Sequence, residues 1–200
     1  MKIIKKLGEG QFGLVFHVED EANNKYALKC IEKAKIVENE MESFIQQERE
    51  IFENLDSPFI VSCYRTFKDS HFIYFLLKMI EGKDFFDILR EIGLLSQQIA
   101  VFYIGCLILA VEYLHSKNIV YRDLKPENAV IDKKGYLIMI DMGTAKFLNE
   151  ENGYRTFTII GTPHYMAPEV VEGKGYSFSV DIWALGIILY EMVCGKLPYG

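Results

Sequence analysis

The stretch YRDLKPEN at residues 121–128 decides the fold and the chemistry expected of this 200-residue chain. Its Asp-x-x-x-x-Asn spacing places a carboxylate, Asp123, and an amide oxygen, Asn128, in one short loop. The carboxylate can accept a proton from a hydroxyl group while the amide oxygen holds a metal ion. Read alone, the stretch could also be an ordinary polar turn.

A second carboxylate follows further along the chain. Asp141-Met142-Gly143 comes directly after a predicted strand, Leu137–Ile140. Hard cations such as Mg²⁺ prefer oxygen ligands and substrate phosphates, so Asn128 and Asp141 are the candidate magnesium ligands. This segment could also be a polar turn. Both segments occur in order after a glycine-rich segment and a pair of charged residues, Lys29 and Glu48. Coincidence is therefore a weak explanation of the whole set.

The first of these features is a glycine-rich segment near the N-terminus. Residues 8–15, GEGQFGLV, fit G-x-G-x-x-G-x-V and join two predicted strands, Ile3–Leu7 and Leu14–Val18. Glycines let backbone N–H groups approach phosphates without obstruction by side chains. The segment alone could be a glycine-rich hairpin turn. A dinucleotide-binding fold shares the spacing, and Glu32 lies near the position of its ribose-binding acid, but the strand–glycine–helix context of that fold is missing.

The second feature is a pair of charged residues on apolar faces. Lys29 lies on a predicted strand, Tyr26–Ile31, on the same face as Ala27 and Ile31, and a buried lysine needs a partner. Glu48 lies on the apolar stripe of a predicted helix, Met41–Leu55, where a lone carboxylate would be unfavourable. One Lys29–Glu48 pair explains both misfits. The alternative is two surface side chains that extend their charged ends into water.

The overall pattern predicts two lobes. A strand-rich first part, which also includes a strand at Phe72–Leu77, precedes a mostly helical second part, with a linker near Lys78–Gly82. Such an order indicates an α+β fold with a cleft between the lobes.

The second part contains two long predicted helices. Ser96 is the expected N-cap of a helix that runs to about His115. Ser179 is the expected N-cap of the other, Val180–Cys194, which should stop at Gly195. Short strands and polar loops are expected over residues 118–140, and a polar loop rich in glycine and threonine over residues 150–163.

Composition excludes several other classes of protein. The net charge of −6 argues against a general nucleic-acid binder and is compatible with a cleft that attracts basic peptides. The four cysteines are far apart and form no CxxC pair, which favours a reducing, cytoplasmic compartment over disulfide or metal chemistry. No apolar run is expected to reach the roughly 18 residues of a membrane span. No signal-peptide core follows the N-terminus.

Together these segments resemble the signature of protein kinases. The resemblance covers nearly the whole chain, and it continues through APE at residues 167–169 to DIWALG at residues 181–186. It implies a bilobal α+β fold with a small antiparallel β lobe that carries one main helix and a mostly helical large lobe. The implied boundaries are a partial kinase domain over 1–200, an N-terminal lobe over 1–78 and an incomplete C-terminal lobe over 79–200.

Finer features point to a subgroup. Lys125, two positions after Asp123, resembles the lysine at this position in kinases of the serine/threonine class. Tyr121 in place of histidine and the run TIIGTP at 158–163 resemble the AGC group. The runs at 116–121 and 142–146 are similar to cyclic-GMP-dependent kinases. The cofactors implied are ATP and Mg²⁺, and the partner implied is a protein or peptide substrate.

The resemblance also implies which residues contact ATP. Gly8, Gly10 and Gly13 would cover the phosphates, and Lys29, held by Glu48, would contact the α- and β-phosphates. The other implied ATP contacts are Leu7, Val15, Ala27, the gatekeeper Leu77, the hinge backbone at Lys78 and Met79, Asp84, Val130 and Asp141.

The catalytic roles come from the second lobe by the same resemblance. Asp123 would position or deprotonate the substrate hydroxyl, and Lys125 would steady the γ-phosphate. Asn128 and Asp141 would bind Mg²⁺. Thr162 would line the site beside Asp123 and Lys125.

The resemblance further implies a regulatory site and a substrate preference. Thr158 stands where AGC kinases are phosphorylated, and a phosphate there can pair with Arg122; the alternative is that Thr158 is a solvated hydroxyl. Glu127, Glu191 and Asp84 would favour substrates with arginine or lysine N-terminal to the target residue.

Some positions depart from the family pattern. Met142 replaces the usual phenylalanine, and His164 and Ile160 replace the residues usual in AGC kinases. The family's later helices and C-terminal tail lie outside these 200 residues, as would the usual arginine partner of Glu169. A catalytically inactive pseudokinase or scaffold fragment is therefore the alternative function. Any cyclic-nucleotide-binding region would also lie outside the chain.

Overall fold

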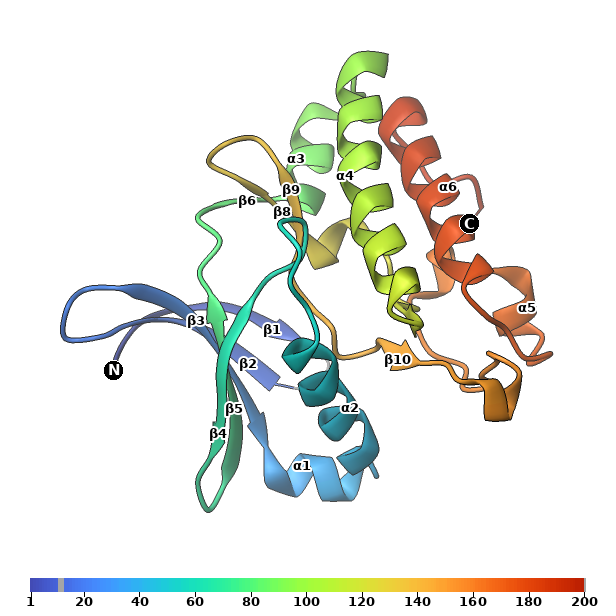
Figure 1. The fold of residues 1–200 in the computed structure, drawn as a ribbon. Coiled ribbons are helices and arrows are strands. Elements are labelled where there is room, and N and C mark those ends of the chain that lie inside the picture. Colours follow the sequence, from blue (N-terminus) through green and yellow to red (C-terminus); the bar gives the residue numbers. More distant parts are fainter. Residues whose placement is uncertain (11–12, 200) are drawn as a thin grey trace. The chain divides into compact units, whose positions relative to one another are not determined.

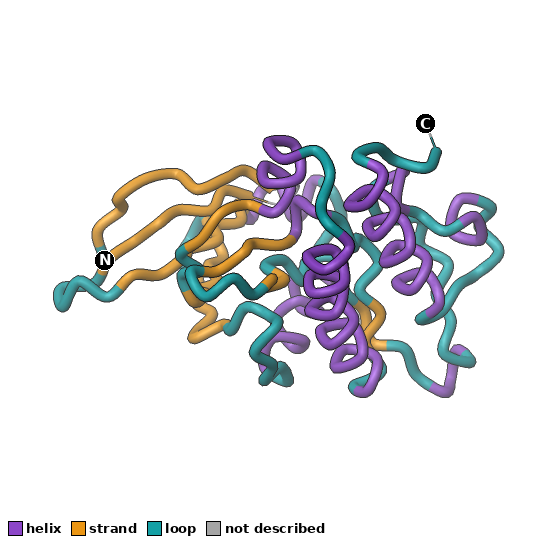
Figure 2. The backbone as a smooth tube through the Cα atoms, turned by 90° about the horizontal axis from the view of Figure 1, so that it is seen from above, coloured by secondary structure: helices purple, strands orange, loops and turns teal. Residues whose placement is uncertain are grey.

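The computed structural model describes residues 1–10 and 13–199. Gln11 and Phe12, which belong to the glycine-rich sequence segment, and the C-terminal Gly200 lie outside the described residues. The chain divides into two units. Unit 1 comprises Met1–Asp56 and Val61–Ile80, and unit 2 comprises Ser57–Ile60 and Glu81–Gly200. Strands dominate unit 1 and helices dominate unit 2 (Figure 2).

Unit 1 is built on an antiparallel sheet of five strands in the order β1-β2-β3-β5-β4 (Figure 1). The strands are β1 (Lys2–Gly10), β2 (Gly13–Glu19), β3 (Lys25–Glu32), β4 (Cys63–Lys68) and β5 (Phe72–Lys78). Two helices, α1 (Lys33–Glu38) and α2 (Glu42–Glu53), follow β3. The three strands expected before residue 32, the strand at 72–77 and the helix near 41–55 are confirmed, with α2 two residues shorter at its C-terminal end. Neither α1 nor β4 was predicted.

Successive side chains of β3 point to opposite faces of the sheet, so Ala27, Lys29 and Ile31 share one face. The opposite face of the sheet holds a separate apolar cluster of Val18, Leu28 and Leu76, with Phe16 and Tyr74 packed against it. Unit 1 therefore buries apolar side chains on both faces of its sheet.

Unit 2 is organised around two long helices, α4 (Gln97–Ser116) and α6 (Ser179–Cys194), which pack against each other (Figure 1). The shorter helices are α3 (Phe85–Ile92) and α5 (Pro168–Val171). Small strands carry the loops: β6 (Gly82–Asp84), β8 (Ala129–Asp132) and β9 (Leu137–Met139) form one sheet, and β7 (Ile119–Val120) pairs with β10 (Lys146–Phe147). The loop expected over 150–163 is largely irregular, apart from short 3₁₀ turns that begin at Glu150 and Pro163.

The ends of the long helices test the cap predictions. Ser96 caps α4 as expected, because its Oγ accepts the Ile99 N–H at 3.4 Å. Gly195 ends α6 in the left-handed region at φ 68°, also as expected. The Ser179 prediction was wrong. Helix α6 already begins at Ser179, its N-cap is Phe178, and the Ser179 hydroxyl donates to Glu169 at 3.5 Å. The side chain thus bonds outside its own helix.

Helix α4 requires a correction to the expectation about membrane spans. Among the described residues it is long and apolar enough to cross a membrane, by length and composition alone. It packs inside unit 2 against α6, β7 and β9, where Ala110, Val111 and Leu114 are almost fully buried. Core packing therefore accounts for much of its apolar character.

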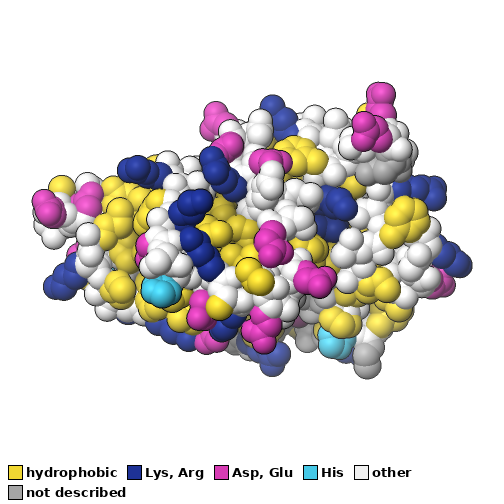
Figure 3. Space-filling view, turned by 90° about the horizontal axis from the view of Figure 1, so that it is seen from below, with side chains coloured by type: hydrophobic (Ala, Val, Ile, Leu, Met, Phe, Trp, Pro, Cys, Tyr) yellow, Lys and Arg dark blue, Asp and Glu magenta, His cyan; other side chains and the backbone are white. Residues whose placement is uncertain are grey.

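On the face drawn in Figure 3, acidic and basic side chains are interspersed with hydrophobic ones. Neither sign of charge dominates that face, in keeping with the small net charge of −6.

Candidate active site

Lys29 and Glu48 form a buried ion pair in unit 1. The Lys29 Nζ lies 2.7 Å from Glu48 Oε1, and the two side chains are 8% and 1% exposed. Strand β3 presents Lys29 opposite Phe75 of β5, while α2 presents Glu48 among its buried residues Ile45, Ile51 and Phe52. The two apolar stripes therefore bring two opposite charges together, as the pattern suggested. The contact of Lys29 with ATP phosphates remains a prediction.

The glycine-rich hairpin forms as expected, with Gly8 opposite Val15 and Gly10 opposite Gly13. A Cβ atom on Gly13 would lie 2.1 Å from the Cys30 carbonyl oxygen, so any side chain there would collide with the backbone of β3. A Cβ on Gly8 would meet no atom within 4 Å. Packing within the sheet thus already requires glycine at position 13, whereas at position 8 it imposes no such requirement.

The other ATP contacts expected in unit 1 gather on neighbouring strands. Ala27 pairs with Leu77 of β5, and Val15 pairs with Lys29. Leu77 is buried, whereas Leu7 is 40% exposed. The Lys78 N–H already donates to the Ser62 carbonyl at 2.9 Å, so a hinge contact at Lys78 would have to use its carbonyl oxygen.

The YRDLKPEN loop of unit 2 is anchored by a buried carboxylate on α6. Asp181, only 1% exposed, accepts the backbone N–H of Tyr121 at 2.8 Å and that of Arg122 at 2.9 Å. His115, at the end of α4, contacts the same carboxylate at 2.7 Å. Arg122 has φ of +76°, a strained value for a residue with a side chain. The Asp181 carboxylate compensates this strain and fixes the start of the loop.

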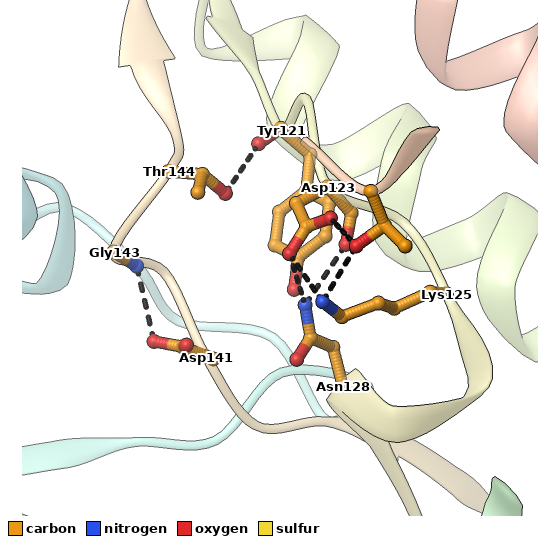
Figure 4. Close-up of polar contacts among 8 residues, drawn as sticks. Tyr121, Asp123, Lys125, Asn128, Asp141, Gly143 and Thr144 are labelled. Carbon is orange, nitrogen blue, oxygen red and sulfur yellow. Dashed lines mark hydrogen bonds and ion pairs between the residues drawn. The ribbon is translucent and has the colours of Figure 1, made fainter. Parts of the chain in front are cut away.

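Asp123 lies at the centre of a polar network (Figure 4). Its Oδ1 accepts the Thr162 hydroxyl at 2.7 Å, and its Oδ2 contacts Lys125 Nζ at 2.9 Å. Lys125 also donates to the Thr162 Oγ1 at 2.7 Å, and Asn128 Nδ2 lies 3.2 Å from Asp123 Oδ2. A carboxylate offers about four acceptor positions, and these three donors leave room for one further hydroxyl. The structure therefore brings together all four residues expected here.

Asn128 and Asp141 fit a divalent cation by their oxygen chemistry. The Asn128 Nδ2 donates to the Asp123 carbonyl at 2.9 Å. This hydrogen bond fixes the amide group and leaves its Oδ1 available as a metal ligand. The Asn128 carbonyl accepts the N–H of Ile140, the residue before Asp141, so the two candidate ligands are tied together through the backbone. No cluster of three or more His, Cys, Asp or Glu side chains suitable for a metal occurs in the described residues. Magnesium commonly uses few protein oxygens and completes its shell with phosphates and water.

Asp84 and Val130, expected to contact the nucleoside, are cross-strand partners of β6 and β8. The Asp84 carboxylate caps α3 by accepting the Phe86 N–H at 2.9 Å. Burial raises the pKa of Asp84, and the negative charges of Asp87 and Glu127 act in the same direction.

Tyr165 contacts Glu191, one of the three acids expected to attract basic substrates. The Tyr165 hydroxyl donates to Glu191 Oε2 at 2.7 Å. Burial raises the pKa of Glu191; the Tyr165 hydrogen bond opposes this rise, while the charge of Glu127 adds to it. Since Glu127 also raises the pKa of Asp84, the three acids expected to attract basic substrates influence one another electrostatically within unit 2.

The loop that carries Thr158 runs beside two cationic side chains. Thr158 itself is exposed, while Thr156 is 3% exposed and accepts a hydrogen bond from Lys146 at 3.2 Å. Burial lowers the pKa of Lys146, and the nearby positive charge of Arg122 lowers it further. Two cations so close to one another would be stabilised by an anion.

Sequence comparison now defines the class. The protein kinase domain family matches residues 1–200, and the chain belongs to this family. It is therefore a protein kinase domain, a transferase, with the expected α+β fold.

Curated proteins with similar sequences show which protein kinases this chain resembles. The chain is 51% identical over 97% of its length to a cGMP-dependent protein kinase of Plasmodium berghei (strain Anka), and covers 22% of that protein. It is 45% identical over its whole length to a cGMP-dependent protein kinase of Toxoplasma gondii and 44% identical to human cGMP-dependent protein kinase 2, of which it covers 20% and 26%. The resemblance to cGMP-dependent kinases of the AGC group is thus confirmed. The chain spans about a fifth to a quarter of the length of these curated relatives.

Proposed function

We propose that the chain catalyses transfer of the γ-phosphoryl group of Mg-ATP to serine or threonine hydroxyls of proteins. The observation that carries the proposal is the network of Asp123, Lys125, Asn128 and Thr162, in which one acceptor position of the Asp123 carboxylate is left for a hydroxyl. Structural ion pairs alone would not need three donors around one carboxylate that is still 12% exposed.

The reaction assigns a role to each of these groups. The Asp123 carboxylate orients the substrate hydroxyl and takes its proton as the oxygen–phosphorus bond forms and the bond to ADP breaks. The Lys125 ammonium stabilises negative charge on the transferred group, and Thr162 holds Lys125 and Asp123 in register. Asn128 and Asp141 would hold Mg²⁺, which neutralises phosphate charge when it is bound. In unit 1, Lys29 would contact the α- and β-phosphates.

Three acidic side chains of unit 2 support a preference for basic substrates. Glu127, Glu191 and Asp84 place negative charge in unit 2, and charge complementarity of this kind favours arginine or lysine near the target residue. Phosphorylation of Thr158 would add an anion beside Arg122 and Lys146, whose positive charges repel each other.

The names of the relatives support activation by cGMP through a regulatory region outside these residues. The cysteines at 30, 63, 106 and 194 are all free, which supports a reducing, cytoplasmic setting.

The test is phosphorylation of a basic serine peptide and its neutral analogue by the intact protein, with and without Thr158→Ala. The proposal predicts a higher kcat/KM for the basic peptide and lower activity of the Thr158→Ala variant. Equal values for the two peptides would refute the basic preference. Undiminished activity of the variant would refute the role of Thr158, and phosphorylation of neither peptide would count against the transferase itself.

A further inference from the structure

Tyr176, in the connection between α5 and α6, is tied to the loop that carries Thr158. Its backbone exchanges two hydrogen bonds with Thr156, at 3.0 and 2.9 Å, which form an isolated antiparallel bridge. The Tyr176 side chain is 3% exposed and packs in a cluster with Val120, Ala167 and Val180. The ring position is therefore fixed by the core of unit 2.

The hydroxyl of Tyr176 reaches two other segments. It donates to the carbonyl oxygen of Thr158. The positive charge of Arg122 also acts on this hydroxyl: burial raises the pKa of Tyr176, and Arg122 opposes that rise. Burial in turn lowers the pKa of Arg122, and Tyr176 opposes that change. The phenol is thus hydrogen-bonded to the loop and is influenced by the charge of the residue directly before Asp123.

Two glycines show how closely the same loop lies on its surroundings. A Cβ on Gly175 would come within 2.5 Å of the Phe157 ring, so the ring occupies the space that a side chain at 175 would need. A Cβ on Gly161 would lie 2.6 Å from the Arg122 carbonyl oxygen. Both glycines also have positive φ values, 76° and 119°. The segment 156–162 is therefore docked at both ends, with the Tyr176 hydroxyl at its middle.

We infer that Tyr176 is a positioning residue whose hydroxyl holds the Thr158 loop against the catalytic loop before any phosphate is present on Thr158. The backbone bridge fixes Thr156 and the hydroxyl fixes the Thr158 carbonyl. The close approach of Gly161 to the Arg122 carbonyl oxygen brings the same segment to the residue before Asp123. This inference rests on the proposed kinase reaction for its kinetic consequence only, because the loop order it predicts can be measured without catalysis.

The test is Tyr176→Phe in the intact, phosphatase-treated protein, with hydrogen exchange of the backbone amides of residues 156–160 as the first readout. Loss of one hydroxyl hydrogen bond should speed exchange in this segment roughly three- to tenfold. The second readout is steady-state kinetics: KM for the peptide should rise by a similar factor, while KM for Mg-ATP stays unchanged. A general loss of stability would instead change both KM values and lower the unfolding midpoint.

The matched control is Tyr154→Phe. Tyr154 packs against the same cluster, and its hydroxyl makes a long, exposed contact of 3.5 Å with Glu150. This variant should leave exchange and kinetics unchanged. Exchange at 156–160 that is equal in wild type and Tyr176→Phe, or equally faster in both variants, would overturn the inference.

A wild-type measurement keeps the inference testable if Tyr176→Phe fails to fold. The Thr156 amide should exchange more slowly than the amides of residues 150–152, and similar rates would contradict a docked loop. If wild type transfers no phosphate, the proposed function fails. If wild type is active and Tyr176→Phe matches it in both readouts, only the role of Tyr176 fails.

Discussion

The ion pair of unit 1 and the Asp123 network of unit 2 use the same kinds of charge in opposite ways. Lys29 and Glu48 are 8% and 1% exposed, so each charge depends on its partner. Lys125 and Asp123 are 21% and 12% exposed and share Thr162 as a further partner, while Asn128 adds a contact to Asp123. A buried pair holds one geometry, whereas a partly open network retains capacity for a substrate group. Under the proposed function, Lys29 would be a fixed cation and Asp123 would belong to the reacting centre.

Breaking the buried pair should have the largest effect on stability. Lys29→Met removes the charge that compensates Glu48 and should lower the free energy of unfolding by about 3–5 kcal/mol, measured by urea denaturation. The thermal shift produced by Mg-ATP should also be smaller than in wild type.

A double variant sharpens this prediction. Lys29→Met with Glu48→Leu removes both charges, so most of the lost stability should return, while the response to Mg-ATP should not. A thermal shift equal to that of wild type would contradict the assignment of Lys29 to the phosphates.

Thr162 tests the shared partner of the open network. Thr162→Val removes its hydrogen bonds with Asp123 and Lys125, each 2.7 Å long. Hydrogen bonds to charged groups contribute about 1.5–3 kcal/mol, so kcat/KM should fall roughly 10- to 100-fold with little change in the unfolding midpoint. Thr162→Ser keeps the hydroxyl and should retain most activity. Equal loss in both variants would mean that the methyl group, not the hydroxyl, matters.

The smallest expected effect concerns pH. Because burial raises the pKa of Glu191, this carboxylate gains a proton at a higher pH than an ordinary glutamate as the solution is acidified. Its negative charge is then lost, and kcat/KM for a basic peptide should decline before that for a neutral peptide. Glu191→Gln should bring the two pH profiles closer together. Parallel profiles in wild type would argue against Glu191 as part of the basic-peptide site.

The sequence pattern was sufficient where a residue carries its own signal, such as a charge on an apolar stripe or a residue type typical of a helix cap. Two charges on apolar stripes predicted the Lys29–Glu48 pair, and the cap residues Ser96 and Gly195 marked helix ends correctly. The resemblance to protein kinases implied that Asp123, Lys125, Asn128 and Thr162 would come together, as they do, although their catalytic roles remain predictions.

The pattern failed where nothing in the sequence around a residue marks its partner. Asp181 anchors the backbone of residues 121 and 122 from about 60 positions away, and no local signal marks it as an anchor rather than a helix-start carboxylate. The same holds for Tyr176 and the Thr158 carbonyl. Ser179 is misleading because its hydroxyl bonds to Glu169, so the residue type suggests a cap that the helix does not use. The six-residue helix α1 has too few turns to show a clear period.

The most direct test of the central claim is phosphoryl transfer by the intact protein and by its Asp123→Asn variant, each saturated with radiolabelled Mg-ATP and a basic peptide. Asparagine keeps the shape of Asp123 but cannot take the proton of the hydroxyl. We predict label on serine or threonine with wild type, a fall in kcat of about 100- to 10,000-fold in the variant, and nearly unchanged affinity for Mg-ATP. Turnover near the wild-type rate in the variant would contradict the assignment of the reacting centre to Asp123.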